Sequence, residues 1–379
     1  MGFNPLFAVF GESMQTDMHY YGTYTIARLA GFNVKEAETI AYAAQYVDDS
    51  TSNDSDEHAD GGLIYGIATA HHNSEVIKNR LIDKKEQKQV WVPFHFLPGG
   101  KGTTVSEKLV CQENSDIAQE MFENHIEHAV NSKYGLQLIG IACHVYADTF
   151  SHYGFSGVGS SQNKVDAASI ELINVKDEGM KAFLTNKFGR FMKNYAPSFL
   201  MNNWRKVASS FAEKASGALG HGAVGTFPDR PFLHWSFNYE LSGKLSDRDN
   251  PASFLRGCEM IYDRLVKFGK ARDPGHTPLK EFHEVRNIIE GILRTEQVMK
   301  DRILCWSEAI ATDLLFEANP NEALHYDKDK WESQKHNFPS LEYSAMATEL
   351  DVYKFHQAAT YHRYFVLKDL LPKHGIVVF

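Results

Sequence analysis

The feature that most constrains the fold is the apolar stretch at residues 134–157, YGLQLIGIACHVYADTFSHYGFSG. Its apolar residues recur at helical spacing, and His144, Asp148 and His152 follow one another at every fourth position. Side chains four residues apart lie on one helix face, so these three drift by only about 80° around the axis over two turns. We therefore expect one apolar helix that presents two imidazoles and a carboxylate to the same neighbour.

The spacing of these three side chains favours a metal site. Imidazole nitrogen and carboxylate oxygen are ligands that zinc takes from proteins. Gly140, one turn before His144, leaves room for another backbone or a substrate. The alternative is a helix with two half-buried histidines and a solvated aspartate, but His-x3-Asp-x3-His on so apolar a helix points to metal binding.

Composition predicts a globular protein with a sizeable core. The chain has 379 residues, enough for one large domain or two, and 43% of them are hydrophobic. The formal net charge of -9 argues against a basic surface for nucleic acid. The cysteines are far apart and form no C-x-x-C, so we expect neither a disulfide framework nor a thiolate zinc site, as in a reducing compartment. They are Cys111, Cys143, Cys258 and Cys305.

The sequence predicts no targeting segment or membrane span. The N-terminal run MGFNPLFAVFGES has no basic region and contains Pro5, so it does not resemble a secretory signal. No run of about 18 apolar residues suggests a transmembrane helix. The default location is cytoplasmic, with export by a signal-independent route as the alternative.

Helix patterns cover most of the chain. Residues 17–30 and 34–49 are predicted as two helices, the second opened by the capping pair Asn33 and Glu36. Short helices or turns are expected up to residue 200. Further helices are expected at residues 115–130, 204–219, 250–268, 277–293, 298–316 and 342–371.

Two stretches have the β-branched and aromatic bias of short strands, residues 62–72 and 89–97. Residues 50–62 and 158–175 are predicted as loops. The expected fold is thus mostly α, a multi-helix bundle with a metal site between helices and a small β or extended insertion at about residues 50–105. We expect a single domain over residues 1–379, in which residues 250–379 could form a C-terminal helical subdomain.

Other candidate ligands lie at helix ends and in a loop. Asp48 and Asp49 close the second helix, where the helix dipole is already negative, so a metal, Lys or Arg should offset them. His221 lies between two glycines, with Asp229 eight residues later. Such a loop can bring backbone close to a ligand, although an ordinary glycine-rich connection would look the same.

A helical His-x3-Asp with a further His after it, an early His, and an Asp about thirty residues beyond that His resemble the zinc-dependent phospholipase C and single-strand nuclease superfamily. Several runs are also similar to an uncharacterised bacterial family related to it. The resemblance implies an all-α enzyme with a cluster of up to three zinc ions. The runs are DMHYYGTYTIARLAGF, AYAAQYVDDS, VPFHFLPGG, HVYADTFSHYGFSG and GHGAVGTFPD.

The resemblance implies roles for individual residues. His144 and Asp148 match the central zinc-binding pair, and His152 stands in for the histidine that follows it. His19 corresponds to the early histidine, and Asp49 or Asp48 to the aspartate that bridges metals or acts as a base.

The chain departs from the superfamily pattern in two places. It has no Trp before Trp91 to supply an N-terminal ligand, and no late His-x3-Glu pair, for which His221 with nearby Asp229 would substitute. His71 or His72 would match the next histidine. The expected metal ligands are Asp17, His19, Asp49, His144, Asp148, His152 and His221.

The expected function is hydrolysis of phosphoric esters by two or three zinc ions, or by another divalent metal, as in phospholipase C. A phospholipid head-group ester is the first substrate, and a nucleotide or nucleic-acid phosphodiester the second. Asp48 or Asp49 could orient or deprotonate the attacking water. His95 could be a substrate contact or general acid, or simply a histidine packed between two phenylalanines.

Competing classes find less support. The chain contains no G-x-S-x-G nucleophile elbow, no adjacent His-Asp pair and no H-E-x-x-H. The non-enzymatic alternative is a helical interaction or toxin module with structural histidines. Its aromatic run at residues 353–365, YKFHQAATYHRYF, would then face a partner or membrane rather than the core.

Overall fold

A computed structural model describes residues 16–70, 87–195, 220–317 and 324–378. Within these residues the fold is mostly α with two small antiparallel sheets, which confirms the predicted class. His71, His72 and the helix predicted at residues 204–219 lie outside the described residues. No described helix is both long and apolar enough to cross a membrane.

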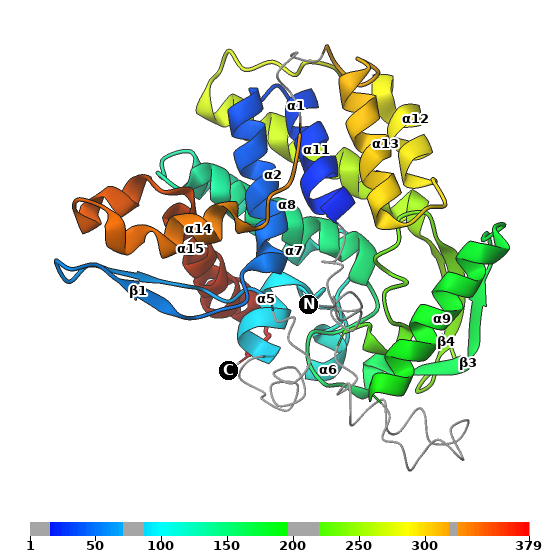
Figure 1. Ribbon diagram of the computed structural model, residues 1–379. Coiled ribbons are helices and arrows are strands. Elements are labelled where there is room, and N and C mark those ends of the chain that lie inside the picture. Colours follow the sequence, from blue (N-terminus) through cyan, green and yellow to red (C-terminus); the bar gives the residue numbers. More distant parts are fainter. Residues whose placement is uncertain (1–15, 71–86, 196–219, 318–323, 379) are drawn as a thin grey trace, which may run out of the picture.

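The apolar helix of the sequence is α8, Gly135–His152, and it crosses the centre of the molecule (Figure 1). Nearly every residue of α8 is buried, because helices surround it on several sides. Gly140 permits the closest of these contacts: a Cβ there would lie 2.4 Å from the Ile40 carbonyl oxygen and 2.5 Å from the Ala43 Cβ. The helices packed on α8 include α2 (Val34–Asp49), α7 (Asp116–Ala129), α11 (Asn250–Arg272) and α15 (Asp351–Tyr364).

The N-terminal helices begin as predicted. The first is a π-helical turn, η2 (Asp17–Gly22), that continues into α1 (Thr23–Leu29). The Asn33 side chain accepts a hydrogen bond from the Glu36 amide at 3.0 Å and so caps α2. The remaining helices are α5 (Val92–Phe94), α6 (Val105–Lys108), α9 (Glu178–Tyr195), α12 (Phe282–Leu293), α13 (Met299–Ala311), α14 (Asp329–His336), α16 (Leu371–Lys373) and the π-helical turns η3 (Gln87–Trp91) and η9 (Phe365–Leu370).

The strands lie mostly where they were not predicted. β1 (Ser55–Glu57) falls in an expected loop and pairs with β2 (Leu63–Tyr65), and the other sheet has the order β3-β4-β5. Of residues 89–97, those up to Phe94 are helical, in η3 and α5, rather than extended, and the predicted loop at 158–175 contains β3. That sheet comprises β3 (Val165–Leu172), β4 (His234–Tyr239) and β5 (Leu245–Asp249).

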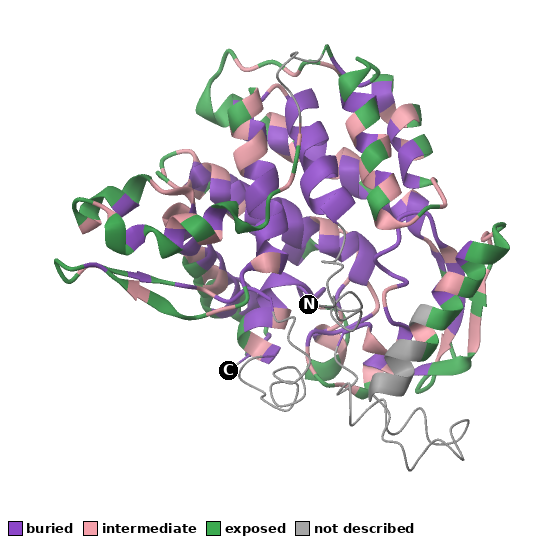
Figure 2. Cartoon of the chain, viewed as in Figure 1, coloured by how far each residue is buried: buried purple, intermediate pink, exposed green. Residues whose placement is uncertain are grey.

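The largest core cluster joins the two ends of the chain. It includes buried side chains from Met18 in η2 to Val378 after α16, with α8 between them (Figure 2). A second cluster lies beneath the three-stranded sheet and includes Phe96, Phe155 and Trp235. The C-terminal end of α8 lies between these two clusters, and this is where the candidate ligands gather.

Candidate metal centre

Asp148 on α8 is surrounded by histidines. Its Oδ1 lies 3.3 Å from His19 Nε2. Its Oδ2 lies 3.3 Å from His95 Nδ1, 3.4 Å from His144 Nε2 and 3.5 Å from His152 Nδ1. The predicted row on α8 thus faces one way, and two histidines from other elements meet it there.

Among the described residues, buried imidazoles and carboxylates form three neighbouring groups that could each hold a metal ion. Within each group the ligand atoms lie within 4.8 Å of one another, and every member is buried. The first two groups share a histidine, so ions held there would be neighbours. The groups are His19, His144 and Asp148; Asp48, His95 and His144; and His152, His221 and Asp229.

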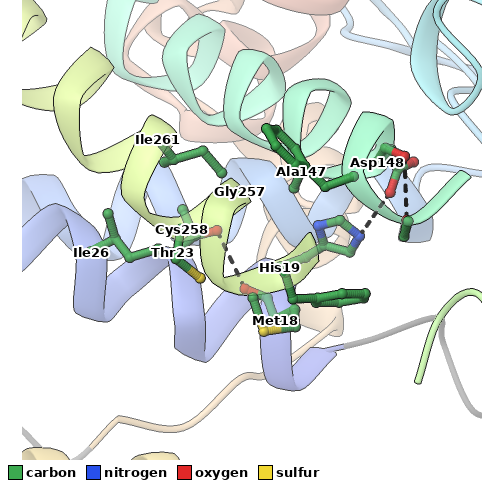
Figure 3. Close-up of a pocket in the computed structure, with 12 residues that line it drawn as sticks. Met18, His19, Thr23, Ile26, Ala147, Asp148, Gly257, Cys258 and Ile261 are labelled. Carbon is green, nitrogen blue, oxygen red and sulfur yellow. Dashed lines mark hydrogen bonds and ion pairs between the residues drawn. The ribbon is translucent and has the colours of Figure 1, made fainter. Parts of the chain in front are cut away.

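Five parts of the chain contribute to these groups. Figure 3 shows His19 of η2 and Asp148 of α8 pointing toward one another, joined by a dashed contact. Asp48 comes from the last turn of α2. An earlier part of the same helix approaches α8 closely at Gly140. His95 is the residue that follows α5, and His221 and Asp229 lie in the segment before β4.

Three of the histidines are oriented by backbone carbonyls. His95 Nε2 lies 2.8 Å from the Thr69 oxygen, His152 Nδ1 2.8 Å from the His95 oxygen, and His221 Nδ1 2.6 Å from the Gly225 oxygen. Since a carbonyl only accepts, each of these nitrogens carries the proton. In the neutral ring the opposite nitrogen therefore presents its lone pair to the group, which is the usual arrangement of metal-ligating histidines.

The carboxylates of the three groups are almost completely buried. Burial, together with the negative charges of Asp148 and Asp49, raises the pKa of Asp48 well above its usual value. Asp229 lies 3.0 Å from His152 Nε2 and 3.5 Å from His221 Nε2. Three buried carboxylates gathered here favour additional positive charge, which divalent cations would supply.

Two histidines of α8 have opposite pKa shifts. Burial, together with the charge of neighbouring His19, lowers the pKa of His144 to about 3. Burial also lowers the pKa of His152, but Asp148 and Asp229 outweigh it and raise the value to about 9. Burial alone would raise the pKa of Asp148, yet the same histidines hold it well below the usual value. In the metal-free protein at neutral pH, His152 therefore carries an extra proton and a positive charge.

Two predicted ligands lie outside the groups. Asp17 forms a buried ion pair with Arg302, whose Nε lies 2.6 Å from Asp17 Oδ2. Asp49 accepts hydrogen bonds from the Tyr326 hydroxyl at 2.5 Å and from Gln45 Nε2 at 3.3 Å. The structure therefore brings neither carboxylate to the histidines, in contrast to what the sequence led us to expect.

Three further residues join the groups. His95 and Asp48, expected as catalytic residues, stand among the ligand-type side chains, and for Asp48 this was the alternative to Asp49. Asp229, expected near His221, joins His152 and His221. Arg248 of β5, fully buried, donates to the carbonyls of Ser151 and Tyr153 at 2.5 and 2.6 Å. This guanidinium caps the C-terminal end of α8 beside His152, and no spacing in the sequence could have indicated it.

Neither curated proteins nor solved structures gave a significant match to the chain. One family model matches residues 14–370, a span that includes every candidate ligand. The chain belongs to this family, which is described as a family of unknown function, DUF6765.

Proposed function

We propose that this protein is a metal-dependent hydrolase of phosphoric esters with a multinuclear centre at the C-terminal half of α8. The observation that carries the proposal is the set of three buried His and Asp groups, two of which share His144. The resemblance of the α8 sequence to zinc-dependent phospholipases C and nucleases supplies the reaction class.

Zinc is the metal that the donor set fits best. The groups contain imidazoles and carboxylates and no thiolate, a set that zinc accepts, although other divalent metals accept it too. His144 belongs to two groups, so the ion that it ligates would lie beside the remaining ligands of the other group. Bound zinc ions would acidify a water molecule and neutralise the oxygens of a phosphodiester.

The chain's own residues would hold and move charge around those ions. His95, His152 and His221 would keep their lone pairs directed inward through their backbone hydrogen bonds. Asp48 is buried in one of the groups and lies 3.9 Å from His95 Nδ1. We therefore assign Asp48 one of two roles, as a ligand of an ion or as the carboxylate that accepts a proton from water.

A phospholipid head-group ester is the preferred substrate, and a nucleotide or short single strand is the second candidate. The net charge of -9 disfavours long nucleic acids, whose backbone would be repelled. The non-enzymatic alternative loses support from α15, because Phe355, His356 and His362 of the aromatic run are buried rather than presented to a partner.

Metal analysis tests the proposal directly. Protein purified under mild conditions should contain about two or three zinc ions per chain. His144→Ala should lose at least one of them and all phosphodiesterase activity, whereas His234→Ala should keep the zinc ions and the activity. His234 is a suitable control because it pairs with Asp247 away from the groups. Metal-free wild-type protein would refute the proposal.

Substrate class is decided by comparing zwitterionic phospholipid vesicles with a dinucleotide and a short single-stranded DNA. We expect release of the phosphorylated head group from the vesicles, abolished by Asp148→Asn and by a chelator. If the protein hydrolyses the dinucleotide or the DNA but not the vesicles, it is a nuclease or nucleotide phosphodiesterase instead.

A further inference from the structure

A small cavity lies beside His19, and Asp148 also lines it. Its volume is about 20 Å³, and it is enclosed by η2 and α1, by α8, and by α11 (Figure 3). Most of its lining is apolar, including Ile26, Cys258 and Ile261. Polar side chains also reach it, among them His19 and Thr23.

His19 differs from the three histidines that are fixed by carbonyls. Its Nε2 faces Asp148, while its Nδ1 is buried and makes no hydrogen bond with any described residue. The two nitrogens of an imidazole point in divergent directions, so Nδ1 cannot also face Asp148. With a cation on Nε2, Nδ1 would carry a proton with no protein acceptor, which is costly in a buried position.

Thr23 offers the complementary group on the same cavity. Its hydroxyl donates to the Met18 carbonyl at 3.4 Å, so the oxygen keeps its lone pairs as acceptors. The cavity thus has a donor on His19 and an acceptor on Thr23. A volume of at least about 10–15 Å³ with two or more polar partners is what a buried water needs, and this cavity meets both conditions.

We propose that this cavity binds one water molecule, which accepts a hydrogen bond from His19 Nδ1 and donates one to Thr23 Oγ1. The water does for His19 what backbone carbonyls do for His95, His152 and His221. It fixes the ring so that Nε2 is directed at the cation held with His144 and Asp148. The water site stands on the cavity alone, whereas its role as a support for a metal ligand rests on the proposed function.

Thr23→Val tests the role, because it removes the hydroxyl and keeps the shape of the side chain. We expect it to weaken one zinc ion by about 10- to 100-fold in a chelator competition titration, with the other ions unaffected. His19→Ala identifies that ion by removing it. Thr23→Ser should bind zinc like the wild type. Thr25→Val is the matched control, since Thr25 is buried in α1, donates to the Tyr21 carbonyl and does not line the cavity.

A high-resolution crystal structure tests the water site with or without metal. An ordered water within hydrogen-bond distance of both His19 Nδ1 and Thr23 Oγ1 is the expected result, and a dry cavity would overturn the site. If wild-type protein binds zinc and Thr23→Val binds every ion equally tightly, the supporting role is overturned while the proposed function stands. If the wild type binds no zinc, the proposed function fails, and the crystal structure still decides the water.

Discussion

At the scale of single residues, the protonated state of His152 links the candidate centre to pH. Its pKa in the folded, metal-free protein is raised to about 9 from an ordinary value of 6.5. A raised folded-state pKa contributes stability that is fully present below pH 6.5 and is lost as the pH rises through about 9. Zinc would displace the proton, so the effect belongs to metal-stripped protein only.

We therefore expect the free energy of unfolding of stripped protein to fall between pH 6.5 and 9, measured by urea denaturation across that range. His152→Gln cannot take up the proton, so its stability should depend much less on pH in this window. Parallel pH profiles for the stripped wild type and the variant would show that another group is responsible.

The buried pair of Asp17 and Arg302 gives a second prediction at this scale. Both side chains are almost completely buried, so removing either partner leaves the other charge unpaired. Asp17→Asn or Arg302→Met alone should lower the free energy of unfolding by about 3–5 kcal/mol. The double variant should lose less than the sum of the two.

Zinc content separates this pair from the metal centre. If Asp17 is only a partner of Arg302, then Asp17→Asn retains every zinc ion that the wild type binds. Loss of an ion from this variant would return Asp17 to the ligand set. Additive single effects in a double-mutant cycle would show that the pair does not act as a unit.

Some residues of the candidate site could be predicted from the sequence, and others could not. His144, Asp148 and His152 were recognisable because the period of a helix alone aligns them. The role of Asp17 was not, because its partner Arg302 lies 285 residues away in sequence. Asp48 and Asp49 are adjacent and point about 100° apart on α2, and the sequence alone did not decide which of them the site uses. The packing of α2 on α8 directs Asp48 toward the histidines and Asp49 toward Tyr326.

At the scale of elements, the contact between α2 and α8 depends on Gly140. A Cβ at this position would meet the backbone of Ile40 at 2.4 Å, and backbone cannot move aside as a flexible side chain can. We expect Gly140→Ala to lower the free energy of unfolding by about 1–3 kcal/mol, although alanine is the better helix former. It should also weaken metal binding, since Asp48 is carried by α2.

Gly291→Ala in α12 is the matched control, because nothing lies within 4 Å of a Cβ added there. It should raise stability by up to about 1 kcal/mol. Urea denaturation of both variants gives the comparison. Equal effects of the two substitutions would mean that helix propensity, rather than the approach of α2, governs the behaviour at Gly140.

Helices were predicted well and strands poorly, for a physical reason. Caps and the period of 3.6 are local, as Asn33 at the start of α2 illustrates. Strand β3 has no regular alternation of buried and exposed residues, and its partner β4 lies some sixty residues later. The sequence near β3 therefore contained neither the alternating pattern of a strand nor an adjacent partner strand. Residues 92–97 are all buried, and a short continuous run of that kind does not distinguish a strand from a helix.

At the scale of the whole molecule, the candidate ligands connect parts of the chain that are distant in sequence. His19 comes from η2, Asp48 from α2, and His221 with Asp229 from the loop that leads into the three-stranded sheet. Each packs against α8, so cations between them would tie the N-terminal helices and the sheet to the central helix. Metal binding should therefore stabilise the whole fold rather than one loop.

Removal of metal is the corresponding prediction. An ion that binds only the folded protein, present at a hundred times its dissociation constant, adds about 2.7 kcal/mol to the free energy of unfolding. A chelator should therefore lower the melting temperature of the wild type, and added zinc should restore it. His234→Ala should respond in the same way, whereas His144→Ala should be much less sensitive because His144 serves two of the groups. A melting temperature of metal-loaded wild type that ignores the chelator would show that the cations do not connect these elements.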